Sequence, residues 1–412
     1  MIAEIITIGD ELLIGQVINT NATWISQQLH NAGIDVYQVT AVSDRKEHIL
    51  QALHESTARS SLIILTGGLG PTKDDITKDT LVEFYNTKLI FDKQTFENIR
   101  KIFLARGWEV SERNKRQAEI PANCKPILNT KGTASGMWFE QDGKILISLP
   151  GVPFEMEAMM EDYVIPKLTE NERKDYIFHK TIQTVGVGES YLAELISKWE
   201  DSLPSNIRLA YLPQLGIVRL RLSARGPILE ELQSQVEKEA SKLKMLIPES
   251  IFGYENDTLE EVIGRILKSK KLTVCTAESC TGGYIAHLIT SVPGSSEYFT
   301  GSIVAYDNQV KEQLLGVKSE TLKNSGAVSE EVVKEMASGA INKFHSDCAI
   351  SVSGIAGPDG GTPDKPVGTV WIAIAVNHQI IAKKFMFGDH RGRNIHRAAI
   401  AALNMLRLEI LK

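Results

Sequence analysis

The chain has 412 residues, of which 43% are hydrophobic and 23% are charged, a composition typical of soluble globular proteins with buried cores. This length exceeds what one hydrophobic core usually supports, so we expect two or three domains. A formal net charge of -6 argues against tight binding to a nucleic-acid backbone or an anionic membrane and favours small-molecule chemistry.

The first residues include an acid at position 4 and no basic segment, so they indicate a first strand rather than a signal peptide. The longest apolar run, near residues 370–376, is too short to span a bilayer. The four cysteines show no C-x-x-C spacing, which argues against a zinc site and a disulfide framework. We therefore expect a cytoplasmic protein.

The first part of the chain alternates short β-branched runs with helical stretches. Strands are expected at residues 5–8, 36–42 and 61–66, and helices at 22–32 and 48–58. Strands that alternate with helices imply βαβ units and a parallel sheet with covered faces. The pattern predicts an α/β domain over residues 1–168.

Two turns of this domain carry candidate site residues. One follows the first strand and contains Asp10, and the other follows the strand at 61–66 and contains Asp74 and Asp75. The carboxyl ends of parallel strands are where open α/β sheets bind ligands. Carboxylates suit a divalent metal or acid/base chemistry, although helix capping by Asp74 and Asp75 is the alternative. The second turn also has glycines whose amides suit a phosphate: Gly67, Gly68 and Gly70.

A different pattern of strands and helices follows over residues 176–250. It predicts strands at 179–185 and 216–224 and helices at 189–199 and 228–246, which make a small α+β connector with a KH-like pattern. Its segment GVGE, residues 186–189, is not the basic G-x-x-G loop of nucleic-acid-binding KH domains. Thr258 and Glu261 have capping-box spacing, so a helix and a third domain, 255–412, begin there.

The third domain alternates again and is expected to be α/β. Its predicted strands are 272–276, 301–306, 348–353, 369–376 and 380–387, and its predicted helices are 281–291, 329–344 and 393–411. The segment TAESCTGG, residues 276–283, lies where a strand ends and a helix begins. Free N–H groups at such a helix start point at any bound anion or carbonyl oxygen, which makes Ser279 a candidate nucleophile.

A serine needs a base, and no histidine lies in or beside this motif. The segment GSIVAYDNQVK, residues 301–311, offers Tyr306 and Lys311, and a lysine neutralised by burial can act as that base. In the competing interpretation Ser279 is only a helix cap and Lys311 is a solvated surface residue. A third segment, SGIAGPDGGTP at 353–363, is dense in glycine, which suits close approach of the backbone to a ligand.

Five ordered motifs together resemble the CinA C-terminal family, the nicotinamide-nucleotide amidases, over about residues 255–412. They are residues 276–283, 301–311, 326–329, 353–361 and 365–370. The resemblance implies hydrolysis of nicotinamide mononucleotide to nicotinate mononucleotide and ammonia, without a metal or other cofactor. It assigns the nucleophile to Ser279, the base to Lys311 and a supporting donor to Tyr306.

The same resemblance implies substrate-binding residues: Thr281, Gly282, Ser353, Gly354, Ala356 and Arg393. Arg393 and Arg397 lie four apart on one helical face, with guanidinium geometry suited to a phosphate. Arg393 matches the family's arginine. Because the stretch GDHRGR, residues 388–393, is longer than the family's form, Arg391 is the alternative.

The N-terminal turns, with GTASG at 132–136 and LPGVP at 149–153, resemble the molybdopterin-binding domain that forms the N-terminal half of CinA proteins. The resemblance covers about residues 1–165, with Ser135 where that family has proline. It implies ADP-ribose pyrophosphatase activity that depends on a divalent metal ion (Mg, Mn or Co), with K as a further ion.

We thus expect two three-layer α/β domains joined by a KH-like connector, acting on nicotinamide mononucleotide and ADP-ribose. Family likeness also predicts a homodimer, without membrane or nucleic-acid partners. One alternative is a competence or DNA-repair accessory protein that binds nucleic acid. Another is an N-terminal enzyme alone, acting on ADP-ribose or adenylylated molybdopterin, with an inactive C-terminal domain.

Overall fold

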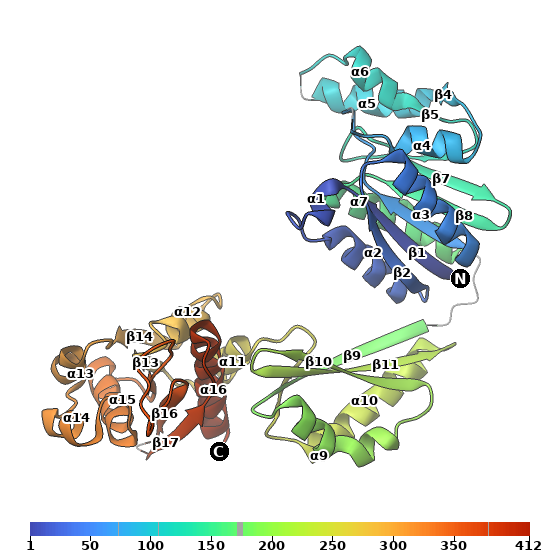
Figure 1. The fold of residues 1–412 in the computed structure, drawn as a ribbon. Coiled ribbons are helices and arrows are strands. Elements are labelled where there is room, and N and C mark those ends of the chain that lie inside the picture. Colours follow the sequence, from blue (N-terminus) through green and yellow to red (C-terminus); the bar gives the residue numbers. More distant parts are fainter. Residues whose placement is uncertain (73, 106, 171–175, 378) are drawn as a thin grey trace. The chain divides into compact units, whose positions relative to one another are not determined.

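A computed structural model describes the whole chain except residues 73, 106, 171–175 and 378. The chain forms two compact units (Figure 1). The first comprises Met1–Phe178 and Arg225–Leu232, and the second comprises His179–Ala224 and Gln233–Lys412. The KH-like connector and the C-terminal domain therefore share the second unit, each with its own sheet.

The first unit contains a six-stranded sheet of order β2-β1-β3-β8-β7-β6. Four neighbouring strands are parallel as predicted, but β7 and β6 are antiparallel. The reversal arises at a two-residue turn in which Asp142 and Gly143 both have positive φ, the signature of a tight hairpin. The strands are β1 Ile2–Ile8, β2 Asp35–Val42, β3 Leu62–Thr66, β6 Lys125–Ile127, β7 Gly136–Gln141 and β8 Lys144–Leu149.

Helices cover both faces of this sheet, which gives the three predicted layers. Successive residues of β1 point to opposite faces, so Ile5 packs with α2 and α7 while Ile6 packs with α3 and α4. The helices are α1 Asp10–Leu13, α2 Thr20–Asn31, α3 Lys46–Arg59, α4 Thr77–Phe84, α5 Lys93–Ala105, α6 Glu112–Lys115, α7 Pro153–Met159 and α8 Ile165–Thr169. Short β4 (Leu89–Phe91) and β5 (Glu119–Pro121) pair beside α5 and α6, at one end of the unit (Figure 1).

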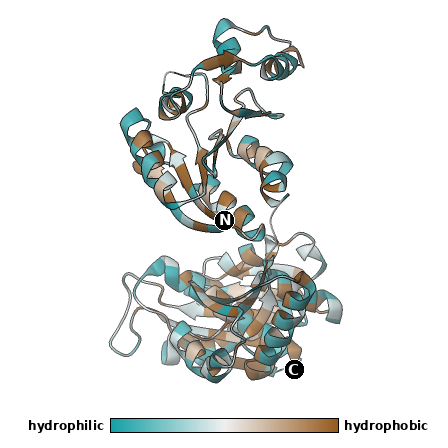
Figure 2. Cartoon of the chain, turned by 90° about the vertical axis from the view of Figure 1, so that its right-hand side faces the viewer, coloured by the Kyte–Doolittle hydropathy of each residue, from teal (hydrophilic) through white to brown (hydrophobic). Residues whose placement is uncertain are grey.

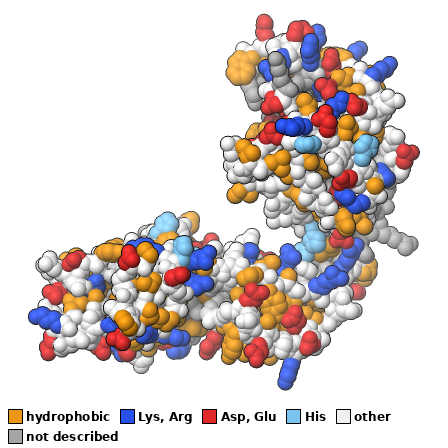
Figure 3. Space-filling model, in the orientation of Figure 1, with side chains coloured by type: hydrophobic (Ala, Val, Ile, Leu, Met, Phe, Trp, Pro, Cys, Tyr) orange, Lys and Arg blue, Asp and Glu red, His pale blue; other side chains and the backbone are white. Residues whose placement is uncertain are grey.

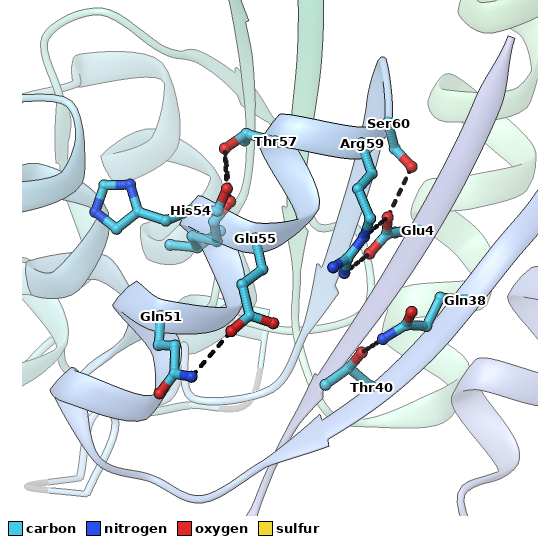
Figure 4. A network of polar contacts seen from close by, with 10 residues as sticks. Glu4, Gln38, Thr40, Gln51, His54, Glu55, Thr57, Arg59 and Ser60 are labelled. Atoms are coloured by element: carbon cyan, nitrogen blue, oxygen red, sulfur yellow. Dashed lines mark hydrogen bonds and ion pairs between the residues drawn. The ribbon is translucent and has the colours of Figure 1, made fainter.

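A buried carboxylate ties β1 to α3 (Figure 4). Glu4 is only 1% exposed and accepts two hydrogen bonds from the Arg59 guanidinium, at 3.1 and 3.0 Å, and one from the Ser60 hydroxyl at 2.9 Å. Burial alone would raise the pKa of Glu4, but hydrogen bonds from Arg59, Ser56 and Ser60 outweigh it and lower that pKa. The carboxylate is thus held charged inside the unit.

Replacing Glu4 with glutamine is expected to lower the free energy of unfolding by about 1–3 kcal/mol at pH 7, because a charge-assisted pair loses its anion. A lowered folded pKa means that the carboxylate's contribution is present above its usual pKa and is lost as the pH falls through the folded value. The deficit of Glu4→Gln should therefore shrink in acid. Urea unfolding at several pH values measures it, and a deficit independent of pH would contradict the assignment.

The connector has a four-stranded sheet of order β10-β11-β9-β12, and α9 and α10 lie on the same side of it in Figure 1. Trp199 of α9 donates its indole N–H to Glu239 of α10 at 3.2 Å, so the two helices are fixed to each other. The elements are β9 Tyr176–Val185, α9 Glu189–Asp201, β10 Ile207–Gln214, β11 Ile217–Gly226, α10 Leu229–Leu246 and β12 Ile251–Tyr254.

The C-terminal domain has a five-stranded sheet of order β14-β13-β15-β16-β17, of which the first three strands are parallel and the last two antiparallel. Helices α11, α12 and α16 cover one face, and α13 and α15 cover the other. The strands are β13 Val274–Glu278, β14 Phe299–Val304, β15 Cys348–Gly354, β16 Thr369–Val376 and β17 Gln379–Met386. The helices are α11 Leu259–Lys270, α12 Tyr284–Thr290, α13 Asn308–Leu315, α14 Ser319–Ser325, α15 Glu330–Phe344 and α16 Arg391–Leu411.

The predicted capping box is present at α11, where Thr258 and Glu261 bond each other's backbone N–H. Hydrophobic colours mark the strands, whereas the helices mix both colours (Figure 2). On the face drawn in Figure 3, basic and acidic side chains are intermixed. Within the described ranges, no helix is both long and apolar enough to cross a membrane.

Candidate functional site

Three predicted motifs of the C-terminal domain follow parallel strands and meet at one edge of the sheet. Ser279 comes directly after β13, and its N–H donates to Val352 of β15 at 2.9 Å. On the other side of β13, the Ala305 N–H after β14 donates to the Glu278 carbonyl at 2.7 Å. The candidate nucleophile thus lies between the segments that carry Tyr306 and Ser353, at the edge where such sheets bind ligands.

Glu278, which the sequence analysis did not single out, organises this edge. Its side chain is fully buried and accepts hydrogen bonds from the N–H groups of Gly283, Ile285 and Ala286, at 3.0, 3.1 and 2.8 Å. The prediction that free amides of this helix start would face a ligand is therefore wrong. A carboxylate from the chain itself occupies them, and α12 begins at Tyr284 rather than near residue 281.

Glu278→Ala is expected to leave these amides without acceptors and to cost at least about 2 kcal/mol in the free energy of unfolding. The turn that carries Ser279 should loosen as well, so activity should fall in Glu278→Gln, which keeps the shape but loses the charge. Thermal unfolding and turnover of both variants measure this. Glu297→Gln, an exposed residue of the same domain, is the control. Unchanged turnover in Glu278→Gln would contradict the role.

The turn after Ser279 offers a hydroxyl that no described protein group binds, and an open position beside it. Thr281 is 3% exposed, and its Oγ1 is buried without a hydrogen-bond partner among the described residues. Gly282 has φ +61° and faces open space, since a Cβ there would meet no atom within 4 Å. An unpaired buried hydroxyl costs free energy, so a water molecule or a ligand group is expected to complete its bonding.

Lys311, the predicted base, is 1% exposed and lies on α13. Its Nζ donates to the carbonyl oxygens of Ala305 at 2.9 Å and Tyr306 at 3.4 Å. Burial lowers the pKa of Lys311, against smaller opposing effects of Asp307 and Cys280. The interpretation of Lys311 as a solvated surface residue is wrong, because its side chain is almost completely buried. No other lysine among the described residues is so deeply buried.

No hydrogen bond joins Ser279 Oγ to Lys311 Nζ among the described contacts, but Lys311 lies near enough to Cys280, the residue after Ser279, for the two side chains to interact electrostatically. Burial raises the pKa of the Cys280 thiol to about 12, and the charges of Arg391 and Lys311 act on it in the opposite direction. The side chains of Arg391 and Lys311 therefore both lie near the turn that begins at Ser279. Catalytic hydrogen bonds are often long in ligand-free enzymes and tighten when substrate binds.

The structure connects Arg391, rather than Arg393, to the predicted site. Arg391 donates to the Tyr306 hydroxyl at 2.9 Å and to the Gly357 carbonyl at 2.9 Å, joining two of the motifs. The side chains of Tyr306 and Arg393 are exposed, and among the described contacts the Arg393 guanidinium makes no hydrogen bond, while its backbone N–H donates to His390 Nδ1. Arg397 donates to the Phe387 carbonyl at 3.0 Å, which directs it elsewhere.

The glycine-rich loop after β15 is held from two sides. Ser353 is buried and donates to the Ala327 carbonyl at 2.7 Å, so its hydroxyl already has a partner. A Cβ at Gly354 would lie 2.7 Å from Val370 and 3.0 Å from the Cys280 sulfur, so this position keeps the loop against the Ser279 turn. Asn394, missed in the sequence, binds the Ala356 carbonyl at 2.9 Å. The signal available in the sequence was an uncharged polar residue among the basic residues at 391–397.

In the N-terminal domain the predicted glycines serve the turn itself. Gly67 and Gly68 have φ of +119° and +64°, and a Cβ at either would collide, with the Ile8 carbonyl and with Thr77 respectively. A Cβ at Gly70 would lie 2.6 Å from Asp75, whose carboxylate accepts the Thr72 N–H at 2.7 Å. Asp75 is therefore engaged in the turn, but it does not cap the following helix as the alternative predicted, because the N-cap of α4 is Ile76 and no side chain caps that helix.

Asp10 and Asp74 lie with an acid that the sequence analysis missed, Asp44. The Asp10 N–H donates to Asp44 Oδ2 at 3.0 Å. Burial raises the pKa of Asp44, and the charges of Asp10, Glu11 and Asp74 add to this. Among the described residues no three His, Cys, Asp or Glu side chains form a ready metal cage. A magnesium-type ion needs no such cage, since it is commonly held by one or two carboxylates together with substrate phosphates, so a metal here stays a prediction.

Three family models match successive parts of the chain. They describe a probable molybdopterin binding domain at residues 4–170, a damage-inducible protein CinA KH domain at 179–253, and a CinA C-terminal domain at 256–410. A similar solved structure is the competence/damage inducible protein CihA from Agrobacterium tumefaciens, 36% identical with a TM-score of 0.36. It covers 38% of this chain and 98% of its own.

Relatives also match over the full length. A CinA-like protein from Cytophaga hutchinsonii is 47% identical over 408 residues, covering 99% of this chain and 98% of the relative. A putative competence-damage inducible protein from Caldicellulosiruptor saccharolyticus is 43% identical and covers 100% of both chains. With all three domains in the same order and identity sustained from end to end, the chain belongs to the CinA family.

Proposed function

We propose that the C-terminal domain hydrolyses the carboxamide of nicotinamide mononucleotide, giving nicotinate mononucleotide and ammonia. The observation that carries this proposal is the buried Lys311, whose pKa is lowered by burial, beside a turn with Ser279 and an unpaired Thr281 hydroxyl. A neutral amine has two N–H bonds and one lone pair. The carbonyls of Ala305 and Tyr306 satisfy the N–H bonds, which leaves the lone pair free to accept a proton.

In the proposed reaction Ser279 Oγ attacks the amide carbon while its proton passes to Lys311. The carbonyl oxygen becomes an oxyanion, for which the hydroxyl of Thr281 is the candidate donor. Lys311 then returns the proton to the departing nitrogen, and ammonia leaves an ester on Ser279. Water, deprotonated by the same lysine, cleaves that ester and regenerates both side chains. Arg391 is the candidate partner of the substrate phosphate, since its guanidinium donates to the hydroxyl of Tyr306, a residue of the proposed site.

The test is ammonia release from nicotinamide mononucleotide by the full chain in the presence of a chelator, with the second product identified by chromatography. We expect stoichiometric ammonia and nicotinate mononucleotide without added metal. No release by the folded chain would overturn the proposal, and release of free nicotinamide would indicate cleavage of the glycosidic bond instead.

We propose that the N-terminal domain is a metal-dependent pyrophosphatase acting on ADP-ribose. The supporting observation is the concentration of negative charge at Asp10, Asp44 and Asp74, which a divalent cation would neutralise when it binds with a pyrophosphate. Such an ion would stabilise charge that develops on the phosphate oxygens.

AMP release from ADP-ribose measures this second activity, with Mg²⁺, Mn²⁺ or Co²⁺ and with a chelator. Asp10→Asn and Asp44→Asn are each expected to lower the rate at least about 100-fold, because each removes an anionic candidate ligand. Asp142→Asn, in the β7–β8 turn, is the control, since asparagine tolerates its positive φ. AMP release that survives the chelator would argue against a metal-dependent site.

A further inference from the structure

A cavity lies within the second unit, apart from the Ser279 turn. Its volume is about 610 Å³, and it is lined by the α9 start of the connector and by β17 and α16 of the C-terminal domain. None of Ser279, Tyr306, Lys311 or Arg391 lines it. Ligand pockets commonly have volumes of about 300–1,000 Å³, so this cavity has room for a nucleotide-sized molecule.

A buried amide on α16 faces this cavity with an unused donor. Asn404 is 9% exposed, and its Oδ1 accepts from Arg407 Nε at 3.0 Å and Nη2 at 2.9 Å. Its Nδ2 has no hydrogen-bond partner among the described contacts, and it lies 3.1 Å from where a Cβ of Gly186 would be. The amide N–H groups are therefore available to an acceptor placed beside the Gly186 loop.

Two further donors line the same cavity. Arg397, about two turns before Asn404 on α16, uses Nη1 to bind the Phe387 carbonyl at 3.0 Å and keeps its other N–H groups. The 13-residue helix α9 begins at Glu189 with Gly188 as its N-cap, so no side chain caps its first N–H groups. A guanidinium, an amide and an uncapped helix start together suit a phosphate.

An aromatic wall completes the cavity. Phe385 and Phe387 lie on the same face of the chain with ring centroids 5.4 Å apart and planes 7° apart. With Ile400 they give the apolar surface on which a planar ring can stack. The acids Glu189 and Glu249 and the base Lys383 also line the cavity, but all three are exposed, so water and salt screen them more than the half-buried Arg397.

We propose that this cavity binds a nucleoside monophosphate, with the phosphate held by Arg397, Asn404 and the start of α9, and the base stacked on Phe385 and Phe387. The site is separate from the proposed amidase site and does not depend on that activity. Its occupant would contact the connector and the C-terminal domain together, because the cavity is lined by both.

The test is calorimetric titration of the full chain with AMP in a chelator, which removes metal-dependent binding in the N-terminal domain. Arg397→Gln and Asn404→Asp are each expected to weaken binding at least tenfold. Asn404→Asp keeps the acceptor for Arg407 and replaces only the donor, so the fold should persist, as a thermal melt would verify. Lys384→Gln, next to Lys383 but not lining the cavity, is the matched control and should bind AMP as the wild type does.

A further variant separates the two sites of this unit. Arg391→Gln should leave AMP affinity unchanged if the cavity is the binding site. AMP binding lost in Arg391→Gln but kept in Arg397→Gln would assign it to the amidase site and overturn the proposal. So would absence of binding to the wild type, or equal affinity for adenosine and AMP.

Discussion

Replacing Ser279 with alanine is expected to abolish ammonia release from nicotinamide mononucleotide, with a loss of at least about 10⁴-fold, the scale seen when a catalytic nucleophile is removed. The fold should be unaffected, because the Ser279 hydroxyl makes no hydrogen bond in the described structure, and its backbone bonds to Val352 and Gly282 remain. Substrate affinity should also persist, since the oxygen contributes to attack rather than to binding. The measurement is single-turnover ammonia release, with substrate binding followed by calorimetry.

Ser291→Ala is the matched control for this variant. Ser291 lies just after α12, and among the described contacts its hydroxyl donates to the Leu288 carbonyl alone, so loss of that hydroxyl should leave turnover unchanged. Substantial turnover by Ser279→Ala would show that water attacks the amide directly, and the covalent step of the proposal would then be wrong.

Lys311→Met is expected to lower turnover by about 10²–10⁴-fold, the usual contribution of a positioned general base. Methionine fills the buried space without supplying a lone pair for the Ser279 proton. In the wild type, turnover should rise as the pH increases through the lowered pKa of Lys311, because only the neutral amine accepts a proton. The variant should lose this rise. Lys323→Met, in the last turn of α14, is the control.

The same substitution has a stability signature that separates a base from a structural lysine. Since the folded pKa of Lys311 lies below its usual value of 10.5, the unfolded chain binds the proton more tightly between those values. The free energy of unfolding of the wild type should therefore rise with pH over that interval, relative to Lys311→Met. A constant difference between the two would indicate that the amine stays charged in the folded protein, which would contradict its role as base.

Much of the architecture was predictable because hydrophobic periodicity reflects local backbone geometry. The alternation of strands and helices identified both three-layer domains, and Thr258 with Glu261 fixed the start of α11. Lys311 was also found from its spacing after a strand, although its helix, α13, was read as a turn. The antiparallel strands at one edge of each of these two sheets were not predicted, because strand direction depends on tertiary pairing.

The bonding of the helix start after Ser279 could not be predicted, because residue spacing does not show where the Glu278 side chain points. Glu278 could have pointed to solvent or into the sheet; its bonds to Gly283, Ile285 and Ala286 appear only when the turn closes. Likewise, Arg391 and Arg393 are two positions apart on one helix, so they point in different directions. Of the two, Arg391 binds Tyr306. Choosing between them required the neighbouring loop.

Helix α16 has a mechanical consequence. Its first turn places Arg391 and Asn394 at the loop after β15, where they bind the Gly357 and Ala356 carbonyls, while Arg407, four turns on, donates to the Ile251 carbonyl of the connector strand β12 at 3.2 Å. Its 21 residues make a rod about 30 Å long at 1.5 Å per residue. A tilt of about 2° about the connector end would move the first turn by about 1 Å, a displacement that can change a catalytic rate about 100-fold. We therefore expect that a displacement of the connector would be transmitted along α16 to the loop after β15, beside the proposed site at Ser279.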